Sequence, residues 1–313
     1  MMRAFVFPGQ GSQAVGMGRE ISQAFRAARE TFAAVDEALG QNLSRLMFEG
    51  PENELVLTEN TQPALMAVSL AVMRVLEREG GFDLSRHVAF VAGHSLGEYS
   101  ALAASHSLAI EDTARLLKRR GQAMQRAVPV GEGAMAALLG VELEAARDIA
   151  REAAQDGICA CANDNGGSQI VVSGDKKAVE RAIAIASARG VKRAILLPVS
   201  APFHCPLMAP AAVEMAQALE TVRLSAPEVP LAANVTASAT RDPATIRRLL
   251  VEQVTGLVRW RESMLYLKSE GVQSLVEIGS GRVLSGLAKR IDRSLEASAI
   301  GTPGEIETFL KSL

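Results

Sequence analysis

Short apolar runs alternate with longer stretches of helical period in the first and last thirds of the chain. Runs of strand length predict β-strands at Arg3–Phe7, Val88–Ala92, Pro230–Val235 and Val272–Ile278. Apolar residues spaced three and four apart predict helices over Arg19–Leu39, Pro63–Glu77, Ile110–Val128 and Asp242–Leu250. We expect Thr61-Gln62-Pro63 to open the second of these helices. Alternating strands and helices favour an α/β fold with a mostly parallel sheet covered on both faces.

The middle of the chain has a different order of elements. Strand-like segments are expected at 133–141, 158–162, 169–173 and 193–199, with helices at 142–154 and 176–189. The order βαββαβ is that of a ferredoxin-like module. We therefore predict a small domain at 129–199, inserted into a larger domain made of 1–128 and 200–313.

A Gly-x-Ser-x-Gly turn follows the strand at Val88–Ala92 and leads into an alanine-rich helix. In a nucleophile elbow, a serine occupies a tight strand-to-helix turn, and the flanking glycines let the strand and the helix pass closely. Ser95 therefore projects at the positive end of the next helix, where negative charge is favoured. The motif predicts acyl transfer to Ser95; the alternative is a structural turn that holds a serine.

A serine needs a base, and the chain has only four histidines. His87 is expected roughly 26 Å from Ser95 along the strand, and His106 about 16 Å along the next helix. His94 adjoins Ser95 but faces elsewhere, which favours a role in lining the pocket. His204, in a loop between the two predicted domains, is therefore the predicted general acid and base.

The group that orients the histidine cannot be chosen from the pattern. Asp164, Asp175 and Asp242 are candidates for an acidic third member, and a backbone carbonyl is an equal alternative.

Arg120 falls on the apolar face of the helix at Ile110–Val128, whereas Lys118 and Arg119 do not. A buried guanidinium is costly unless a carboxylate meets it, and its planar fork suits a bidentate carboxylate. The pattern leaves two alternatives open. Arg120 either forms an internal ion pair or binds an acidic ligand.

The loop Pro8–Gln13 follows the first strand and contains two glycines. It lacks the Gly-Lys-Ser/Thr ending of a phosphate-binding loop. Oxyanion holes combine the amide after the nucleophile with one from a loop after another strand. We therefore expect this loop to contribute an amide to the Ser95 site, the alternative being a plain turn.

Composition narrows the class of protein. The chain has 313 residues, 48% of them hydrophobic, and a net charge of −2, which argues against a nucleic-acid binder. Its three cysteines fit neither a disulfide framework nor a Cys-x-x-Cys metal pair. No signal peptide is recognised, and the apolar stretch Ala64–Leu76 is too short to span a bilayer. We expect a cytoplasmic protein without membrane contact.

Several motifs together resemble one family. They are, in order, Phe7-Pro8-Gly9-Gln10-Gly11-Ser12-Gln13, Thr61-Gln62-Pro63-Ala64, Gly93-His94-Ser95-Leu96-Gly97-Glu98-Tyr99, Arg120-Gly121 and Ala201-Pro202-Phe203-His204. Over essentially its whole length the chain is similar to the malonyl-CoA:acyl carrier protein transacylases. Their acyltransferase family also includes the acyltransferase domains of polyketide and fatty acid synthases. The resemblance implies a larger hydrolase-like α/β domain with a ferredoxin-like insertion.

The resemblance also implies roles for individual residues. It places the nucleophile on Ser95 and the base on His204, with oxyanion amides from Gln10 and Leu96. It assigns Arg120 to the free carboxylate of malonate. The remaining implied positions are the histidine-orienting carbonyl of Gln253 and the pocket residues Gln10, His94, Asn163 and Asn165. The chain departs from the family at Thr255–Val258, where Asn-Pro-Val is common, and at Ser280, where proline is usual.

The activity implied is transfer of a malonyl group from malonyl-CoA to acyl carrier protein in fatty acid biosynthesis, by a ping-pong route through malonyl-serine. The resemblance implies no metal or redox cofactor, a transient carrier-protein partner and a monomer. Three alternatives are a serine esterase or thioesterase, an acyltransferase that supplies a polyketide-type synthase, and a carrier-protein binding module without catalysis.

Overall fold

The computed structural model describes residues 2–313 and contains two β-sheets. The larger, sheet A, has the order β10-β9-β1-β2-β7-β8. Its strands are β1 (Arg3–Phe7), β2 (Phe90–Gly93), β7 (Leu231–Ala233), β8 (Ser238–Thr240), β9 (Ser274–Ile278) and β10 (Glu296–Ile300). All neighbouring pairs are parallel except β7 with β8. The predicted α/β class with a mostly parallel sheet is confirmed.

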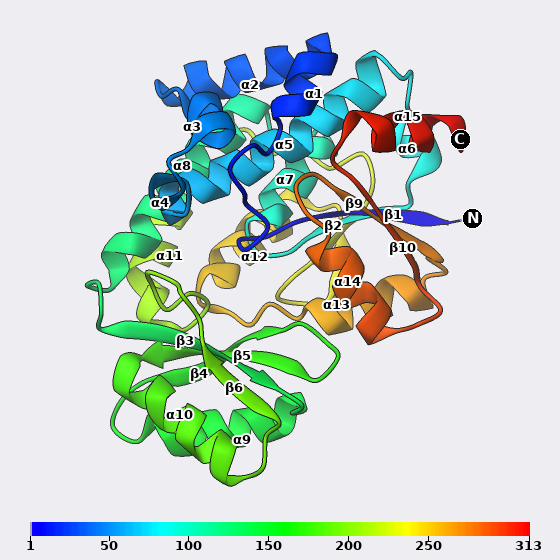
Figure 1. Ribbon diagram of the computed structural model, residues 1–313. Coiled ribbons are helices and arrows are strands. Elements are labelled where there is room, and N and C mark those ends of the chain that lie inside the picture. The colour runs from blue at the N-terminus through cyan, green and yellow to red at the C-terminus, as the bar shows by residue number, and fades with distance from the viewer. Residues whose placement is uncertain (1) are drawn as a thin grey trace.

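Both faces of sheet A are covered, as the alternation along β1 shows. Phe5 and Phe7 belong to one apolar cluster, and Ala4 and Val6 to another on the opposite face. The first cluster contains residues of α1 (Arg19–Ala24), α2 (Arg26–Leu39), α3 (Leu43–Glu49), α4 (Glu52–Leu55), α5 (Thr58–Arg78), α6 (Leu84–His87), α7 (Gly97–Ala104), α8 (Ile110–Ala127), α11 (Ala209–Glu220), α12 (Pro243–Thr255) and α15 (Pro303–Lys311). The second contains residues of α13 (Trp260–Ser269) and α14 (Val283–Ile291) (Figure 1).

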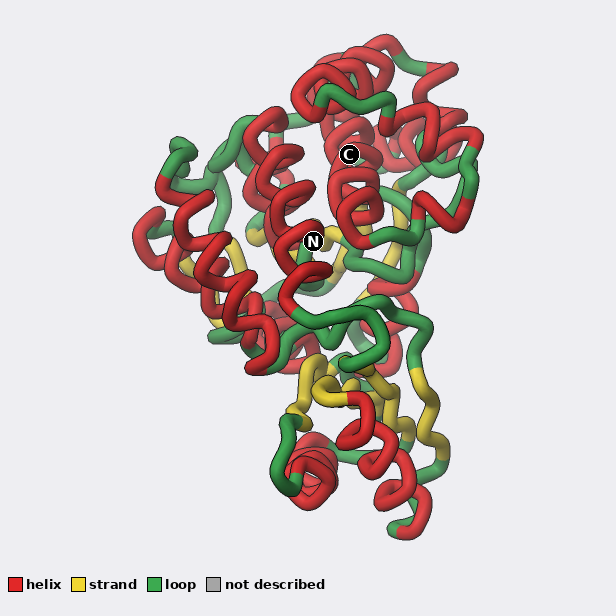
Figure 2. The backbone as a smooth tube through the Cα atoms, turned by 90° about the vertical axis from the view of Figure 1, so that its left-hand side faces the viewer, coloured by secondary structure: helices red, strands yellow, loops and turns green. Residues whose placement is uncertain are grey.

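Sheet B is antiparallel, with the order β4-β5-β3-β6. Its elements are β3 (Gly133–Leu139), α9 (Leu143–Ala154), β4 (Cys159–Asp164), β5 (Gln169–Asp175), α10 (Lys176–Ala188) and β6 (Arg193–Leu196). The predicted βαββαβ order is therefore present. In Figure 2, the two helices lie at one end of the molecule, and the strands of sheet B lie between these helices and the rest of the chain.

The two faces of sheet B have different neighbours. Along β3, Ala134, Ala136 and Leu138 pack in a cluster with residues of α9 and α10. The intervening Met135 and Ala137 belong instead to the cluster of the main body. Because both faces of β3 are apolar, sheet B has one face on its own helices and the other turned toward sheet A, where a cleft is formed.

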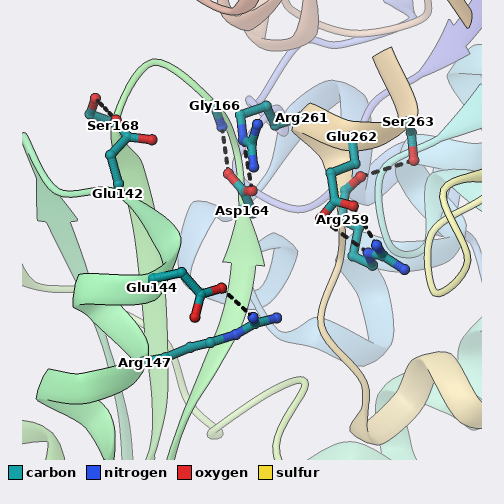
Figure 3. Close-up of polar contacts among 10 residues, drawn as sticks. All are labelled: Glu142, Glu144, Arg147, Asp164, Gly166, Ser168, Arg259, Arg261, Glu262 and Ser263. Carbon is teal, nitrogen blue, oxygen red and sulfur yellow. Dashed lines mark hydrogen bonds and ion pairs between the residues drawn. The ribbon is translucent and has the colours of Figure 1, made fainter. Parts of the chain in front are cut away.

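Polar contacts join sheet B to the main body at the end of β4 (Figure 3). The buried carboxylate of Asp164 accepts hydrogen bonds from Arg261 Nε at 2.9 Å and from the Gly166 amide at 3.2 Å. Asn163 forms a parallel bridge with Val258. We call Asp164 and Arg261 the junction pair.

Among the differences between the structure and the sequence-based expectations, three concern the helices that cover sheet A. The helix expected over Arg19–Leu39 is divided at Phe25, whose backbone is extended. The expected start of the second helix is wrong: α5 begins at Thr58, so Pro63 lies inside it. Thr61 does not cap this helix, because its hydroxyl donates to the Leu55 carbonyl at 2.6 Å. The C-terminal helix α15 was not expected.

No helix in residues 2–313 is long and apolar enough to cross a bilayer.

Candidate active site

Ser95 lies in the turn between β2 and α7, with a φ of 52° that non-glycine residues rarely adopt. The flanking glycines allow this geometry. A Cβ atom on Gly93 would lie 1.9 Å from the Gly97 carbonyl carbon, and one on Gly97 would lie 2.2 Å from the Phe7 carbonyl oxygen. The turn therefore has the close strand-to-helix approach of a nucleophile elbow.

The structure brings Ser95 and His204 together. Ser95 Oγ is 2.7 Å from His204 Nε2, and His204 Nδ1 is 2.8 Å from the main-chain oxygen of Gln253. A carbonyl oxygen only accepts, so we assign the proton to Nδ1, which leaves Nε2 to accept from the serine hydroxyl. This is the arrangement that a base needs. It forms although the chain departs from the family at Thr255–Val258, just beyond Gln253 near the end of α12.

Burial, followed by the positive charge of Arg120, lowers the pKa of His204 to about 3. The imidazole is therefore neutral over the physiological pH range. Only 4% of His204 is exposed. A neutral ring in hydrogen-bond contact with a serine hydroxyl can take up its proton.

No aspartate among the candidates meets the histidine. Asp164 pairs with Arg261, Asp175 accepts a hydrogen bond from the Ile158 amide, and Asp242 caps α12. The alternative of a backbone carbonyl is therefore the one that the structure contains.

The other histidines lie elsewhere. His106 pairs with Glu77 and Glu228, which raise its pKa, and His87 contacts the Asp83 carbonyl.

Arg120 projects from α8 into the site with 1% of its surface exposed. Its guanidinium donates to Gln62 Oε1 and Gln253 Oε1, each at 2.8 Å, and to Ser95 Oγ at 3.2 Å. These partners are neutral, and no carboxylate of the described residues forms an ion pair with Arg120. Burial lowers the pKa of Arg120. The internal ion pair is thus absent, and a buried cation lies beside the nucleophile.

The site contains the two main-chain amides that the resemblance assigns to the oxyanion. Within residues 2–313, neither the Leu96 nor the Gln10 amide donates a hydrogen bond to the protein. Both residues line the cleft. The Gln10 side chain is held separately, because its Oε1 accepts from Thr58 Oγ1 at 3.0 Å. Free amides at this position are suited to an oxyanion.

A cleft of about 590 Å³ separates the elbow from sheet B. From the sheet B side it is lined by Asn163 and Asn165 together with Met135, Ala137 and Val171. His94 Nε2 lies 2.9 Å from Asn165 Oδ1, which connects the two walls of the cleft. Burial lowers the pKa of His94. Its Nε2 meets the acceptor oxygen of Asn165, so His204 is the histidine in contact with Ser95 Oγ. The cleft is large enough for an acyl thioester.

Residues 2–313 contain no group of three or more His, Cys, Asp and Glu side chains arranged to hold a metal ion.

Three buried side chains of the site were not identified as functional from the sequence. Gln62 holds Arg120, Asn234 Oδ1 accepts the Ser95 amide at 2.8 Å, and Glu98 lies beneath the elbow. A weak signal existed for two of them. Glu98 interrupts an otherwise uncharged helix, and Asn234 directly follows an apolar strand, where site residues collect in parallel sheets.

Comparisons with known proteins agree with this geometry. Residues 4–297 match the family described as the acyl transferase domain. The chain is 44% identical over 311 residues to the malonyl CoA-acyl carrier protein transacylase of Bacillus subtilis strain 168, covering 99% of this chain and 96% of that protein. It is 44% identical to the transacylase of the same name from Escherichia coli K12, covering 98% of each.

Solved structures show the same similarity. An acyl-carrier-protein S-malonyltransferase from Bartonella henselae superimposes with a TM-score of 0.98 at 55% identity, over 100% of this chain and 99% of that chain. A malonyl transacylase in complex with its type II PKS acyl carrier protein superimposes with a TM-score of 0.96 at 42% identity, covering all of both chains.

Proposed function

The chain belongs to the acyl transferase family, and we propose that it moves a malonyl group from malonyl-CoA to the phosphopantetheine thiol of acyl carrier protein through a malonyl-serine intermediate. It is an acyltransferase of fatty acid biosynthesis. The choice of a malonyl group rests on Arg120. Its guanidinium is buried, has only neutral hydrogen-bond partners among the described residues, and lies 3.2 Å from Ser95 Oγ.

In the first step, His204 Nε2 takes the proton of Ser95 Oγ as this oxygen attacks the thioester carbonyl carbon. The amides of Gln10 and Leu96 donate to the oxygen that becomes negatively charged. When the tetrahedral intermediate collapses, the C–S bond breaks, and the coenzyme A thiolate takes the proton from His204. The Ser95 ester of malonate remains.

The second step reverses the first with a different thiol. The carrier-protein thiol gives its proton to His204, its sulfur attacks the ester carbonyl, and Ser95 leaves with the proton. Arg120 reaches the free carboxylate of malonate, which is one methylene away from the reacting carbonyl. Both steps exchange one nucleophile for another without a change of oxidation state, so we propose that the reaction needs no metal or redox cofactor.

All the enzyme groups named in these steps come from one copy of the chain, and we therefore propose that the enzyme acts as a monomer. We also propose a cytoplasmic location, which is supported by the free thiols of Cys159, Cys161 and Cys205.

The experiment is intact-mass measurement after incubation with malonyl-CoA, followed by peptide mapping. We expect one malonyl adduct, located on Ser95, that persists in buffer and disappears when phosphopantetheinylated carrier protein is added. Rapid release of free malonate in buffer would instead indicate a hydrolase. A chain that binds carrier protein but never acquires the adduct would be a binding module. The Ser95→Ala variant is the control and should remain unmodified.

A further inference from the structure

Glu98 is a buried carboxylate that the two chemical steps do not use. It lies in the first turn of α7, three residues after Ser95, with 1% of its surface exposed. One of its oxygens, Oε2, accepts from the side-chain amide of Gln253 at 2.7 Å and from the main-chain amide of Asn234 at 3.2 Å. Its burial raises its pKa to about 7. Such a costly group requires an explanation from the contacts that it makes.

The two partners of Glu98 hold the backbone of Ser95 from both sides. Gln253 Nε2 also donates to the Ser95 carbonyl at 3.0 Å, and Asn234 Oδ1 accepts from the Ser95 amide at 2.8 Å. Asn234 Nδ2 donates in turn to the Gly93 carbonyl at 2.7 Å. Because Ser95 has a positive φ, its conformation persists only where surrounding contacts fix it.

Glu98 and Arg120 also determine which way the Gln253 amide points. A guanidinium only donates hydrogen bonds and a carboxylate only accepts them. Gln253 lies between the two, with Oε1 at 2.8 Å from Arg120 Nη2 and Nε2 at 2.7 Å from Glu98 Oε2. The reversed amide would place its NH₂ group against the guanidinium and its oxygen against the carboxylate. Glu98 therefore keeps the side-chain oxygen of Gln253 turned toward Arg120, where it accepts a hydrogen bond from the guanidinium.

We propose that Glu98 is a positioning residue, whose buried acceptor oxygen holds Gln253 and Asn234 so that Arg120 faces the malonyl carboxylate and Ser95 faces His204. The inference rests on the proposed malonyl transfer, since it assigns Glu98 to selection of the acyl group as well as to the nucleophile. Gln253 belongs to both halves of the site, because its main-chain oxygen meets His204 and its side chain meets Arg120.

The test compares Glu98→Met, which keeps the length of the side chain but has no comparable acceptor, with Glu98→Gln, which keeps an acceptor oxygen. The rates of Ser95 acylation by malonyl-CoA and by acetyl-CoA are measured for each variant by intact mass. We expect Glu98→Met to slow both reactions and to lower the malonyl-to-acetyl rate ratio at least about tenfold. Glu98→Gln should keep this ratio within about threefold of the wild type.

The rate ratio separates positioning from loss of folded protein, because partial unfolding lowers both rates in the same proportion. Glu277 supplies a matched control: it is a buried glutamate of β9 that accepts from the Leu284 and Ser285 amides, and its hydrogen bonds involve neither Ser95, Asn234 nor Gln253. We expect Glu277→Met to leave the ratio unchanged, whatever its effect on stability.

Two results would overturn the proposal: an unchanged ratio in Glu98→Met, or a Glu98→Gln ratio as low as that of Glu98→Met. If wild-type Ser95 is not acylated by malonyl-CoA at all, the proposed function itself has failed, and the variants are not needed to show it.

Discussion

Two arginines of this protein lie near the boundary between sheet A and sheet B, and they are bound differently. Arg261, at the junction, pairs with the buried carboxylate of Asp164 at 2.9 Å, and about a third of its own side chain remains exposed. Arg120, on the floor of the cleft, has 1% exposure and only neutral partners. One cation has its counter-ion within the fold. The other has none in direct contact among residues 2–313.

The difference indicates which polar contacts maintain the structure and which await a ligand. A buried charge is costly, and a fold that places no opposite charge in direct contact with it bears much of this cost until a ligand does so. At the junction, the Asp164 carboxylate neutralises the charge of Arg261, and the exposed part of the Arg261 side chain is open to water. In the cleft, the proposed partner of Arg120 is the carboxylate of the substrate. The following predictions test this contrast between the site around Arg120 and Ser95 and the junction pair.

The largest effect on activity is expected from removing the base, His204. In His204→Ala, Ser95 loses the acceptor for its proton, so kcat for malonyl transfer should fall about 10⁴-fold or more. Steady-state assays with carrier protein measure this loss, and circular dichroism checks the fold. A residual rate within tenfold of the wild type would remove His204 from the mechanism.

The next largest effect is expected at Arg120. Arg120→Met keeps much of the volume but removes the cation, so acylation by malonyl-CoA should slow about 10²- to 10³-fold. Acylation by acetyl-CoA, which has no carboxylate to bind, should change little. The melting temperature should not fall, because a buried charge without an ionic partner has been removed. Equal losses for the two thioesters would contradict the role of Arg120 as a carboxylate clamp.

An effect of intermediate size is expected at Glu98, whose titration should make the free energy of unfolding depend on pH. Its pKa is raised from the ordinary 4.5 to about 7, so the folded protein binds more protons than the unfolded chain between these values. The free energy of unfolding therefore decreases as the pH rises through this range. Glu98→Gln lacks this titration and should be more stable than the wild type by about 3 kcal/mol at pH 8.

Urea unfolding at pH 8 and pH 5 measures this difference. Most of the gain should disappear at pH 5, where the wild-type carboxyl is protonated in the fold. A gain that is the same at both pH values would show that Glu98 does not titrate as its burial predicts.

The smallest effect is expected at the junction. Arg261→Gln leaves the Asp164 carboxylate without its cation but with its hydrogen bond from Gly166. Because Arg261 is partly exposed, the loss of stability should be only about 1 to 2 kcal/mol. The malonyl-to-acetyl rate ratio should be that of the wild type. A change in this ratio would show that the junction also shapes the acyl pocket, and the contrast with Arg120 would no longer hold.

Much of the fold was predictable because its signals are local. The strand at Arg3–Phe7 was predicted with its observed bounds, and the helix at Ile110–Val128 differs from α8 by one residue. The helix bounds near Phe25 and Thr58 were missed. An extended residue at Phe25 divides one helical pattern into two helices, and α5 begins before the residues that look like its cap.

The sequence by itself determined the turn that holds the nucleophile and the buried position of the arginine. The elbow around Ser95 is a steric requirement of five consecutive residues, and the position of Arg120 on an apolar face follows from helical periodicity. Elimination among the four histidines selected His204, and the resemblance to a known family added Gln10, Leu96 and Gln253. The structure places His204 in contact with Ser95 and Gln253, and Gln10 and Leu96 line the same cleft.

Only the tertiary structure decided what these residues contact. It showed that no carboxylate of residues 2–313 forms an ion pair with Arg120, and that a main-chain oxygen rather than an aspartate meets His204. It also showed that Glu98 holds Gln253 and Asn234, each of which bonds the backbone of Ser95. Ser95 and Gln253 are 158 positions apart in the chain. Whether such residues touch depends on how the helices pack across sheet A, and a local pattern of apolar and polar residues does not encode that packing.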